Sequence, residues 1–159
     1  MNSPRSFAFS CTVLLFAAVL YAPGAGALAD IYPGPSQAKA DLAAGLRAAA
    51  ANHRRVILDF GGNWCPDCHV LEGYFHNAAN EPLLAAGFVL VHVNIGRMDE
   101  NIAIAQRYQI PLKQGVPALA VLDSDGRLLY SQQSGEFQAM RHMQADAVTA
   151  FLTQWTPPQ

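Results

Sequence analysis

Two cysteines stand two residues apart near the middle of the chain, and a histidine follows directly: Cys65, Cys68 and His69. A cysteine pair at this spacing can cycle between a dithiol and a disulfide. Together with the histidine, it also matches the Cys-x-x-Cys-His pattern of c-type haem attachment. Two thiolates and an imidazole can hold a soft metal such as copper as well. The residue types therefore allow thiol–disulfide exchange, haem attachment or metal binding.

The residues after the pair favour thiol–disulfide exchange. Pro66 suits the first position of a helix, where its missing N–H would be unpaired anyway. Apolar residues then recur at helical spacing: Val70, Leu71, Tyr74, Phe75 and Ala78. A thiolate at a helix N-terminus is stabilised by free N–H groups and the helix dipole, so we expect Cys65 to be the nucleophile. Cys68, one turn further in, is expected to attack the resulting mixed disulfide. A purely structural staple over so short a loop would add little stability.

A carboxylate in the preceding segment could supply the proton acceptor that Cys68 needs. Val56–Phe60 is a short apolar run that predicts a strand buried on both faces, and Asp59 is its only charged residue. Burial disfavours the charged form of a carboxyl group, so Asp59 would be able to take and return a proton. The alternative is that Asp59 lies at the strand end in contact with solvent.

Two alternatives to thiol exchange remain open. A c-type haem electron carrier would need a second axial ligand, for which Met98, Met140 or Met143 could serve. A copper carrier could use Cys65–His69, or Met140, His142 and Met143. A helix packed on a sheet leaves little room for a porphyrin, and three ligands are fewer than structural zinc usually takes. We therefore predict no metal and no cofactor other than a redox-active Cys65–Cys68 disulfide.

The elements that position these residues can be predicted from periodicity and turn signals. Asp30–Pro35 is a proline- and glycine-containing arm, and residues 36–156 are predicted to form one domain with the cysteines at a strand-to-helix turn. The first half of the domain is predicted to contain a helix capped by Ser36 and ending near Asn52, strand Val56–Phe60, the helix after Cys65 and strand Phe88–Ile95. The second half is predicted to contain a helix from Asp99 to Tyr108, the irregular segment Ile110–Gly115, and the hairpin strands Pro117–Asp123 and Arg127–Tyr130. A closing helix carries Val148, Leu152 and Trp155 on one face. This order predicts an α/β fold, with a central mixed β-sheet covered by helices on both faces.

Two stretches resemble the thioredoxin superfamily. Asp59-Phe60-x-x-x-Trp64-Cys65-x-x-Cys68 is similar to the active-site segment of that family, and Gly115-Val116-Pro117 before an apolar strand resembles its cis-proline segment. The resemblance spans about Ser36 to Trp155. It implies a thioredoxin-like three-layer sandwich and the activity of a thiol–disulfide oxidoreductase.

The same resemblance implies how a substrate would bind. If the Val116–Pro117 bond is cis, the backbone of Val116 is free to pair with an extended substrate segment beside the cysteines. Trp64 and Pro66 would complete the substrate-binding surface. The chain departs from the family pattern at Pro66-Asp67, where thioredoxins have Gly-Pro, at His92, where many relatives have lysine, and in the longer segment Ile110–Gly115.

The first 29 residues predict a cleaved signal peptide. Arg5 precedes an apolar run of about 15 residues, which is short of the roughly 20 that a spanning helix needs. Ala27-Leu28-Ala29 offers the small-x-small pattern of a cleavage site before Asp30. Cys11 would leave with this segment. We therefore expect an exported, periplasmic protein in an oxidising compartment, with an uncleaved membrane anchor as the alternative.

Composition limits the partners. With 10 Lys and Arg against 12 Asp and Glu, the chain has no basic surface for nucleic acid. The expected partners are disulfide-bearing or thiol proteins, and the protein itself is expected to be a monomer. Asp67 places a negative charge between the cysteines, which would disfavour the thiolate at Cys65 and so favours a reductase over an oxidant. The family resemblance suggests a membrane thiol as electron donor.

Overall fold

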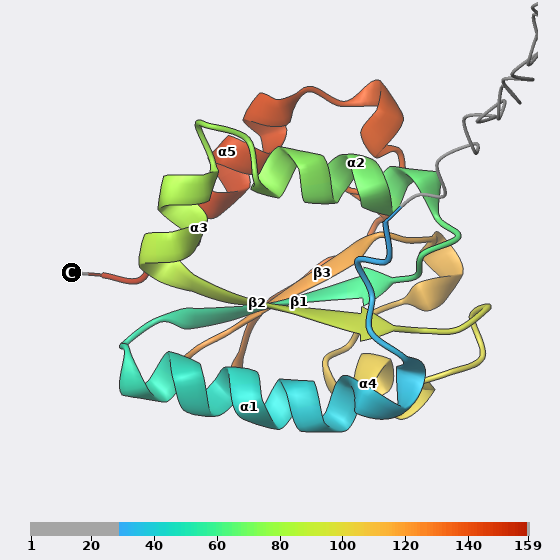
Figure 1. The fold of residues 1–159 in the computed structure, drawn as a ribbon, viewed down its shortest axis with the longest axis horizontal. Coiled ribbons are helices and arrows are strands. Elements are labelled where there is room, and N and C mark those ends of the chain that lie inside the picture. The colour runs from blue at the N-terminus through green and yellow to red at the C-terminus, as the bar shows by residue number, and fades with distance from the viewer. Residues whose placement is uncertain (1–28, 159) are drawn as a thin grey trace, which may run out of the picture.

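A four-stranded mixed sheet lies between two layers of helices in the computed structural model, which describes residues 29–158 (Figure 1). The strands are β1 (Arg55–Gly61), β2 (Phe88–Asn94), β3 (Ala118–Leu122) and β4 (Leu128–Ser131). Their order in the sheet is β2-β1-β3-β4, with β1 parallel to β2 and antiparallel to β3. The predicted α/β three-layer sandwich with a central mixed sheet is confirmed.

Helices cover both faces of the sheet (Figure 1). One face carries α1 (Ala38–Ala51) and α4 (Ile102–Arg107), and the other carries α2 (Pro66–Phe75), α3 (Glu81–Gly87) and α5 (Ala145–Gln154). Three short 3-10 turns complete the fold within the described part of the chain: η1 (Pro35–Gln37), η2 (Leu112–Gln114) and η3 (Met140–His142). Each predicted helix and strand corresponds to one of these elements.

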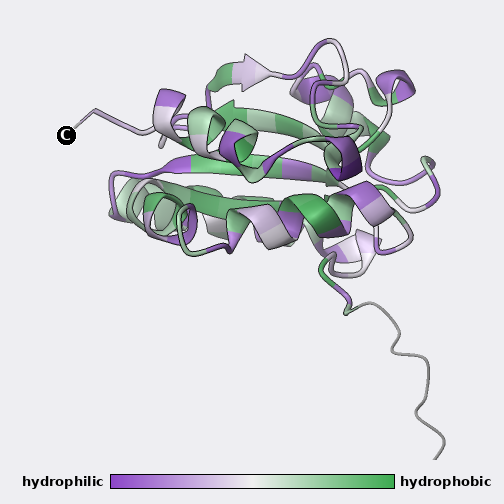
Figure 2. Cartoon of the chain, turned by 90° about the horizontal axis from the view of Figure 1, so that it is seen from above, coloured by the Kyte–Doolittle hydropathy of each residue, from purple (hydrophilic) through white to green (hydrophobic). Residues whose placement is uncertain are grey.

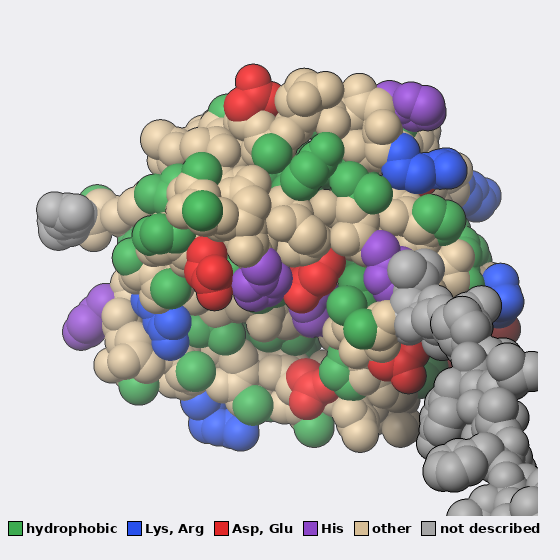
Figure 3. Space-filling model, turned by 45° about the horizontal axis from the view of Figure 1, so that its top comes forward, with side chains coloured by type: hydrophobic (Ala, Val, Ile, Leu, Met, Phe, Trp, Pro, Cys, Tyr) green, Lys and Arg blue, Asp and Glu red, His purple; other side chains and the backbone are tan. Residues whose placement is uncertain are grey.

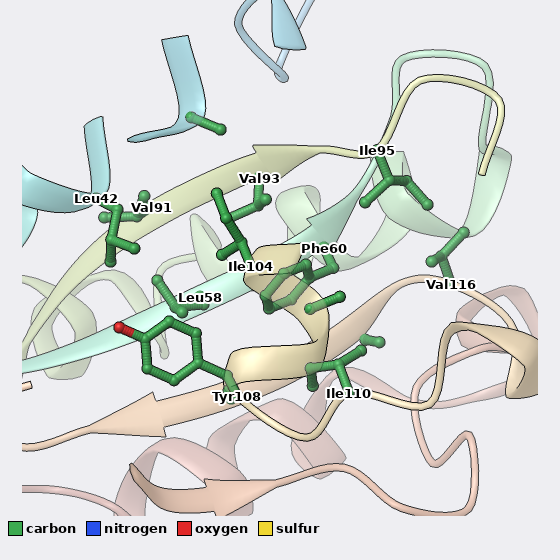
Figure 4. Close-up of a cluster of buried hydrophobic side chains, with 14 of the residues drawn as sticks. Leu42, Leu58, Phe60, Val91, Val93, Ile95, Ile104, Tyr108, Ile110 and Val116 are labelled. Carbon is green, nitrogen blue, oxygen red and sulfur yellow. The ribbon is translucent and has the colours of Figure 1, made fainter. Parts of the chain in front are cut away.

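The core is divided in two by the sheet because side chains alternate along each strand. Leu58 and Phe60 point from β1 toward α1 and α4, where they meet Val93, Ile104 and other apolar residues (Figure 4). Ile57 points to the opposite face and joins the cluster under α2 and α5. Hydrophobic strands are thus enclosed by helices whose outer sides are hydrophilic (Figure 2). This arrangement places the side chain of Asp59 under α2.

Three local predictions differ from the structure. Helix α4 begins at Ile102 rather than just after Asp99, because Asp99 Oδ1 accepts a hydrogen bond from the backbone N–H of Arg97 and so holds a loop. Ser36 does not cap α1, since it lies within the preceding turn η1. Helix α3 was not predicted, because its seven residues contain too few periodic positions to be distinguished from a loop.

The N-terminal arm is a packed part of the domain. The backbone N–H groups of Ile31 and Tyr32 donate to Asn63 Oδ1 at 3.0 and 2.8 Å, and Asn63 Nδ2 donates back to the carbonyl of Tyr32. The side chain of Tyr32 is only 2% exposed. The predicted signal peptide, including Cys11, lies outside the described residues apart from Ala29. Within residues 29–158, no helix has the length and apolar character needed to cross a membrane.

Candidate active site

The two cysteines form a disulfide at the N-terminus of α2. Cys65 is the N-cap of the helix, and its sulfur accepts a hydrogen bond from the backbone N–H of Cys68 at 3.2 Å. Pro66 occupies the first helical turn, as predicted from its type. Helix N–H groups and the positive end of the helix dipole therefore face the sulfur of Cys65, which stabilises a thiolate there when the disulfide is reduced. Cys68 is fully buried.

The segment before β3 lies beside Cys65. The Val116–Pro117 peptide bond is cis, and the carbonyl oxygen of Val116 is 3.7 Å from Cys65 Sγ. Val116 is nearly buried and joins the core cluster under α4 (Figure 4). The structure thus brings Val116 and Pro117 to the cysteine that the sequence predicts to be the nucleophile.

Trp64 lies at the surface next to the disulfide. Its side chain is 38% exposed, and its indole N–H donates to the carbonyl of Gly96. The guanidinium of Arg97 stands 5.5 Å from the centre of the ring, within cation–π range. These two contacts hold the indole in place while leaving one apolar surface open to solvent.

Asp59 is fully buried, so the alternative of a solvated strand end is wrong. Its neighbours across the sheet are His92 on β2 and Leu119 on β3. The hydroxyl of Tyr32 donates to Asp59 Oδ2 at 2.6 Å, and His92 Nδ1 is 3.0 Å from the same oxygen. The other oxygen, Oδ1, is buried and has no hydrogen-bond partner among residues 29–158. Asp59 is therefore held through one oxygen, and the other remains able to accept a proton.

Gly61 on β1 has no side chain, which leaves room for both Cys68 and Tyr32 beside this strand. A Cβ atom at Gly61 would lie 2.7 Å from Cys68 Sγ and would also overlap the hydroxyl of Tyr32. Cys68 Sγ and the Tyr32 hydroxyl thus both lie close to Gly61 of β1. The absence of a side chain at Gly61 allows Cys68 and the Tyr32–Asp59 pair to lie within one small buried volume.

The environment sets the protonation of Tyr32 and His92. Burial, together with the charges of Asp59 and Glu72, raises the pKa of Tyr32 well above its usual value, so this hydroxyl remains a hydrogen-bond donor. Burial alone would lower the pKa of His92. The hydrogen bond to Asp59 and the charges of Asp59 and Glu72 outweigh burial and raise the pKa of His92 above 6.5. His92 therefore carries positive charge more readily than an ordinary histidine.

The carboxylate of Asp67 pairs with Arg141. Asp67 is 8% exposed and accepts hydrogen bonds from the backbone N–H of Arg141 at 2.9 Å and from its Nε at 3.1 Å. Burial would raise the pKa of Asp67, but the hydrogen bonds and charge of Arg141, with the charge of His142, lower it below 3.8. Asp67 is therefore ionised and paired with Arg141, and the predicted effect of its charge on the Cys65 thiolate stays a prediction. Asp67 also ties α2 to η3.

Replacing Asp67 with asparagine is expected to destabilise the protein by about 1–2 kcal/mol near pH 7, because hydrogen bonds to a charged group are lost. Because the pKa of Asp67 is lower in the folded state, ionised Asp67 adds to the free energy of unfolding above pH 3.8. This stabilisation disappears as the pH falls through the pKa of Asp67 in the folded state. Urea unfolding of both proteins at neutral and strongly acidic pH measures this. Asp125→Asn is the control, because Asp125 pairs with Arg127 at the surface and should change little. Equal stability of the Asp67→Asn variant and the parent at pH 7 would contradict the assignment.

The residues proposed for haem or copper have other surroundings. His69 Nε2 contacts the backbone carbonyl of Asn63 at 2.9 Å. Met140 is fully buried in the core between the sheet and α5, where it packs as an apolar side chain. Among residues 29–158, no three side chains of histidine, cysteine, aspartate or glutamate are arranged to hold a metal ion.

Four residues of the site were not predicted from the sequence. They are Tyr32, Glu72, His92 as a partner of Asp59, and Arg141 as a partner of Asp67. Only His92 had an available signal, since aligning the two apolar strands in parallel would have placed it opposite Asp59. The others are brought to the site by contacts between segments distant in the chain.

Comparison with known proteins gives a consistent result. A model of a family described as thioredoxin-like matches residues 37–124. A disulphide isomerase from Xylella fastidiosa Temecula1 is 32% identical, with a TM-score of 0.75, covering 80% of this chain and 98% of that structure. A thioredoxin from Thermus thermophilus is 23% identical with a TM-score of 0.50 over 77% of this chain and 83% of that structure, a likeness of fold. Thioredoxin-3 from Dictyostelium discoideum is 29% identical over 59 residues, which are 37% of this chain and only 54% of that protein.

Proposed function

This chain belongs to the thioredoxin-like family, and we propose that it works as an exported thiol–disulfide oxidoreductase that reduces or rearranges disulfides of protein substrates. The observation that carries the proposal is the Cys65–Cys68 disulfide at the N-terminus of α2, with Cys68 beside the tyrosine that hydrogen-bonds the buried Asp59. A disulfide at a helix N-terminus can be opened to give a stabilised thiolate. The buried acid supplies the proton acceptor for the second thiol.

The reaction would proceed in two steps. The Cys65 thiolate attacks one sulfur of the substrate disulfide, and the electron pair of the broken bond leaves with the other substrate sulfur. Cys68 then loses its proton to Asp59 and attacks Cys65, which forms the Cys65–Cys68 disulfide and releases the substrate as a dithiol. The unpaired Asp59 Oδ1 supports this role, because a buried oxygen without a donor is the favoured place for an arriving proton.

The substrate would lie across Trp64, Pro66, Val116 and Pro117. The exposed indole of Trp64 offers an apolar surface beside Cys65, and the Val116 carbonyl is 3.7 Å from the same sulfur. An extended peptide could therefore pair with the backbone at Val116 while its disulfide meets Cys65. Contacts of this kind favour unfolded or flexible protein segments as substrates.

Export and the direction of electron flow are part of the proposal and have their own support. The leader-like segment before Asp30 supports a periplasmic location. The buried proton acceptor next to Cys68 supports reduction, since the resolving step releases a reduced substrate and requires loss of a proton from Cys68. A reductase outside the cytosol needs an electron donor, and a membrane thiol protein is the kind of partner proposed. The protein is proposed to act as a monomer, without nucleic acid.

Intact mass and insulin reduction together test this function. The full chain is produced in a bacterium with a periplasm and recovered from that compartment. We expect a mass without residues 1–29, a gain of two hydrogen atoms on treatment with dithiothreitol, and faster reduction of insulin disulfides than with dithiothreitol alone. A mass increased by haem, or a bridge that cannot be reduced, would overturn the proposal. Copper that is retained through purification, with no insulin reduction, would favour the carrier alternative.

A further inference from the structure

A row of ionisable side chains leads from the buried carboxylate to the surface. His92 bridges two carboxylates: its Nδ1 is 3.0 Å from Asp59 Oδ2, and its Nε2 is 3.5 Å from Glu72 Oε2. The other oxygen of Glu72 lies 3.3 Å from His76 Nε2. The side chains become more exposed along the row, from 0% at Asp59 through 16% at His92 and 22% at Glu72 to 46% at His76. On this face of the molecule, acidic and histidine side chains alternate along a band (Figure 3).

Sequence spacing and strand register create the row. Asp59 and His92 are direct partners in the parallel pairing of β1 and β2. Glu72 follows Cys68 by four residues, so both project from the same side of α2. Glu72 Oε2 is buried and has no hydrogen-bond partner within residues 29–158, so it can accept a proton from His92. The other ionisable groups that face His92 are the ring of Tyr32, with its centre 5.1 Å away, and Asp41 of α1, which lines the same surface cavity.

We propose that His92 and Glu72 form a proton relay, which releases one proton to solvent for each proton that Cys68 gives to Asp59 during the resolving step. This inference rests on the proposed function. Before the step, ionised Asp59 and protonated His92 form an ion pair. Cys68 gives its proton to Asp59 and its sulfur electron pair to the new bond with Cys65, whose bond to the substrate sulfur breaks. The electrons of that bond leave with the substrate.

Neutralising Asp59 removes the charge that held the proton on His92. His92 then releases its Nε2 proton to Glu72, and from there the proton reaches water directly or through His76. The Nδ1 proton of His92 stays in its hydrogen bond to Asp59 Oδ2, so a neutral Asp59 and a neutral His92 remain, and one proton has entered from Cys68 while one has left at Glu72. The reverse transfers restore the ion pair when the disulfide is next reduced and Cys68 takes its proton back. The Asp59–His92 pair has no net charge before or after the step, which avoids the cost of an isolated buried charge.

The test uses a disulfide whose two halves report the two steps separately. Reduced protein is mixed rapidly with dithiobis(nitrobenzoate), which releases one coloured thiolate when Cys65 attacks and a second when Cys68 resolves. We expect His92→Ala and Glu72→Gln each to slow the second release by about tenfold near pH 7, at the low end of proton-transfer effects. The first release should be unchanged, because it requires no proton from Cys68.

The pH profile and chemical rescue separate a relay from a structural role. The loss should shrink as pH rises toward about 8.5, where a cysteine thiol ionises without help. Added imidazole should restore the second release in the His92→Ala variant, since His92 lines a surface cavity. The control is His53→Ala, an exposed histidine before β1, at the end of the strand opposite the cysteines, which should show neither the loss nor the rescue.

The outcomes distinguish the relay from the function on which it rests. If both variants resolve at the parental rate at every pH, the relay is overturned, while the two colour releases still support the oxidoreductase. A loss that is equal at all pH values and insensitive to imidazole also overturns the relay. If the parent protein releases no second thiolate, the proposed function fails before any variant is compared. Glu72→Gln changes a partly exposed side chain, so it keeps the test valid should His92→Ala fold poorly.

Discussion

Serine at position 65 is expected to abolish disulfide reduction, with a loss of at least about 10³-fold in insulin turnover. The reason is that Cys65 is the sulfur toward which α2 directs its N-terminal N–H groups, and a serine hydroxyl does not ionise there. The Cys65→Ser protein should also form no mixed disulfide with a substrate. Both quantities are measured by insulin turbidity and by mass spectrometry of the reaction without added reductant.

The Cys68→Ser variant is the matched comparison. It keeps the nucleophile and removes the resolving thiol, so mixed disulfides with Cys65 should accumulate and be visible as a mass increase that dithiothreitol reverses. The two substituted positions lie about one helical turn apart. The Cys65→Ser protein is expected to form no mixed disulfide with a substrate, and the Cys68→Ser protein is expected to accumulate it. If Cys65→Ser retained full activity, or if Cys68→Ser turned over normally, the assigned roles of the cysteines would be wrong.

Asparagine in place of Asp59 is expected to slow the resolving step by about 10²-fold while leaving the attack by Cys65 intact. Asparagine has nearly the same shape and can still accept the hydrogen bond from Tyr32, but it cannot take a proton from Cys68. The two-phase thiolate release described above measures both steps in one experiment. The predicted result is a normal first phase and a slow second phase.

Tyr32→Phe provides the control for this prediction. It removes the hydroxyl that holds Asp59 Oδ2 but leaves the carboxyl group, so it should cost about 1 kcal/mol of stability and affect resolution less than Asp59→Asn does. A second phase of normal rate in the Asp59→Asn variant would show that another group accepts the proton.

Local pattern was sufficient to predict most of the fold. The apolar run of β1, Pro66 after Cys65, and the helical spacing that follows place the cysteines at a strand-to-helix turn, as found. Where a loop residue competed for a hydrogen bond, as at Asp99, the predicted helix boundary was wrong. Short α3 had too little periodicity to be recognised.

The candidate site was predictable only in its local part. Cys65, Cys68 and Asp59 lie within ten residues and were found from their spacing. The partners that determine their chemistry come from far away: Tyr32 is 27 residues before Asp59, and Arg141 is 74 residues after Asp67. Such contacts depend on how segments pack in space, and the tyrosine stands in a proline- and glycine-containing arm that carries no periodic signal.

The docked arm has a practical consequence for anyone who prepares this protein. Purification tags, fusion joints or protease sites should end before Asp30, since the side chain of Asn63 hydrogen-bonds the backbone of Ile31 and Tyr32. A chain that begins after Tyr32 would lack the phenol that covers the Asp59 carboxylate, and water would then reach this carboxylate. A shortened version could then look folded by circular dichroism yet report the wrong chemistry.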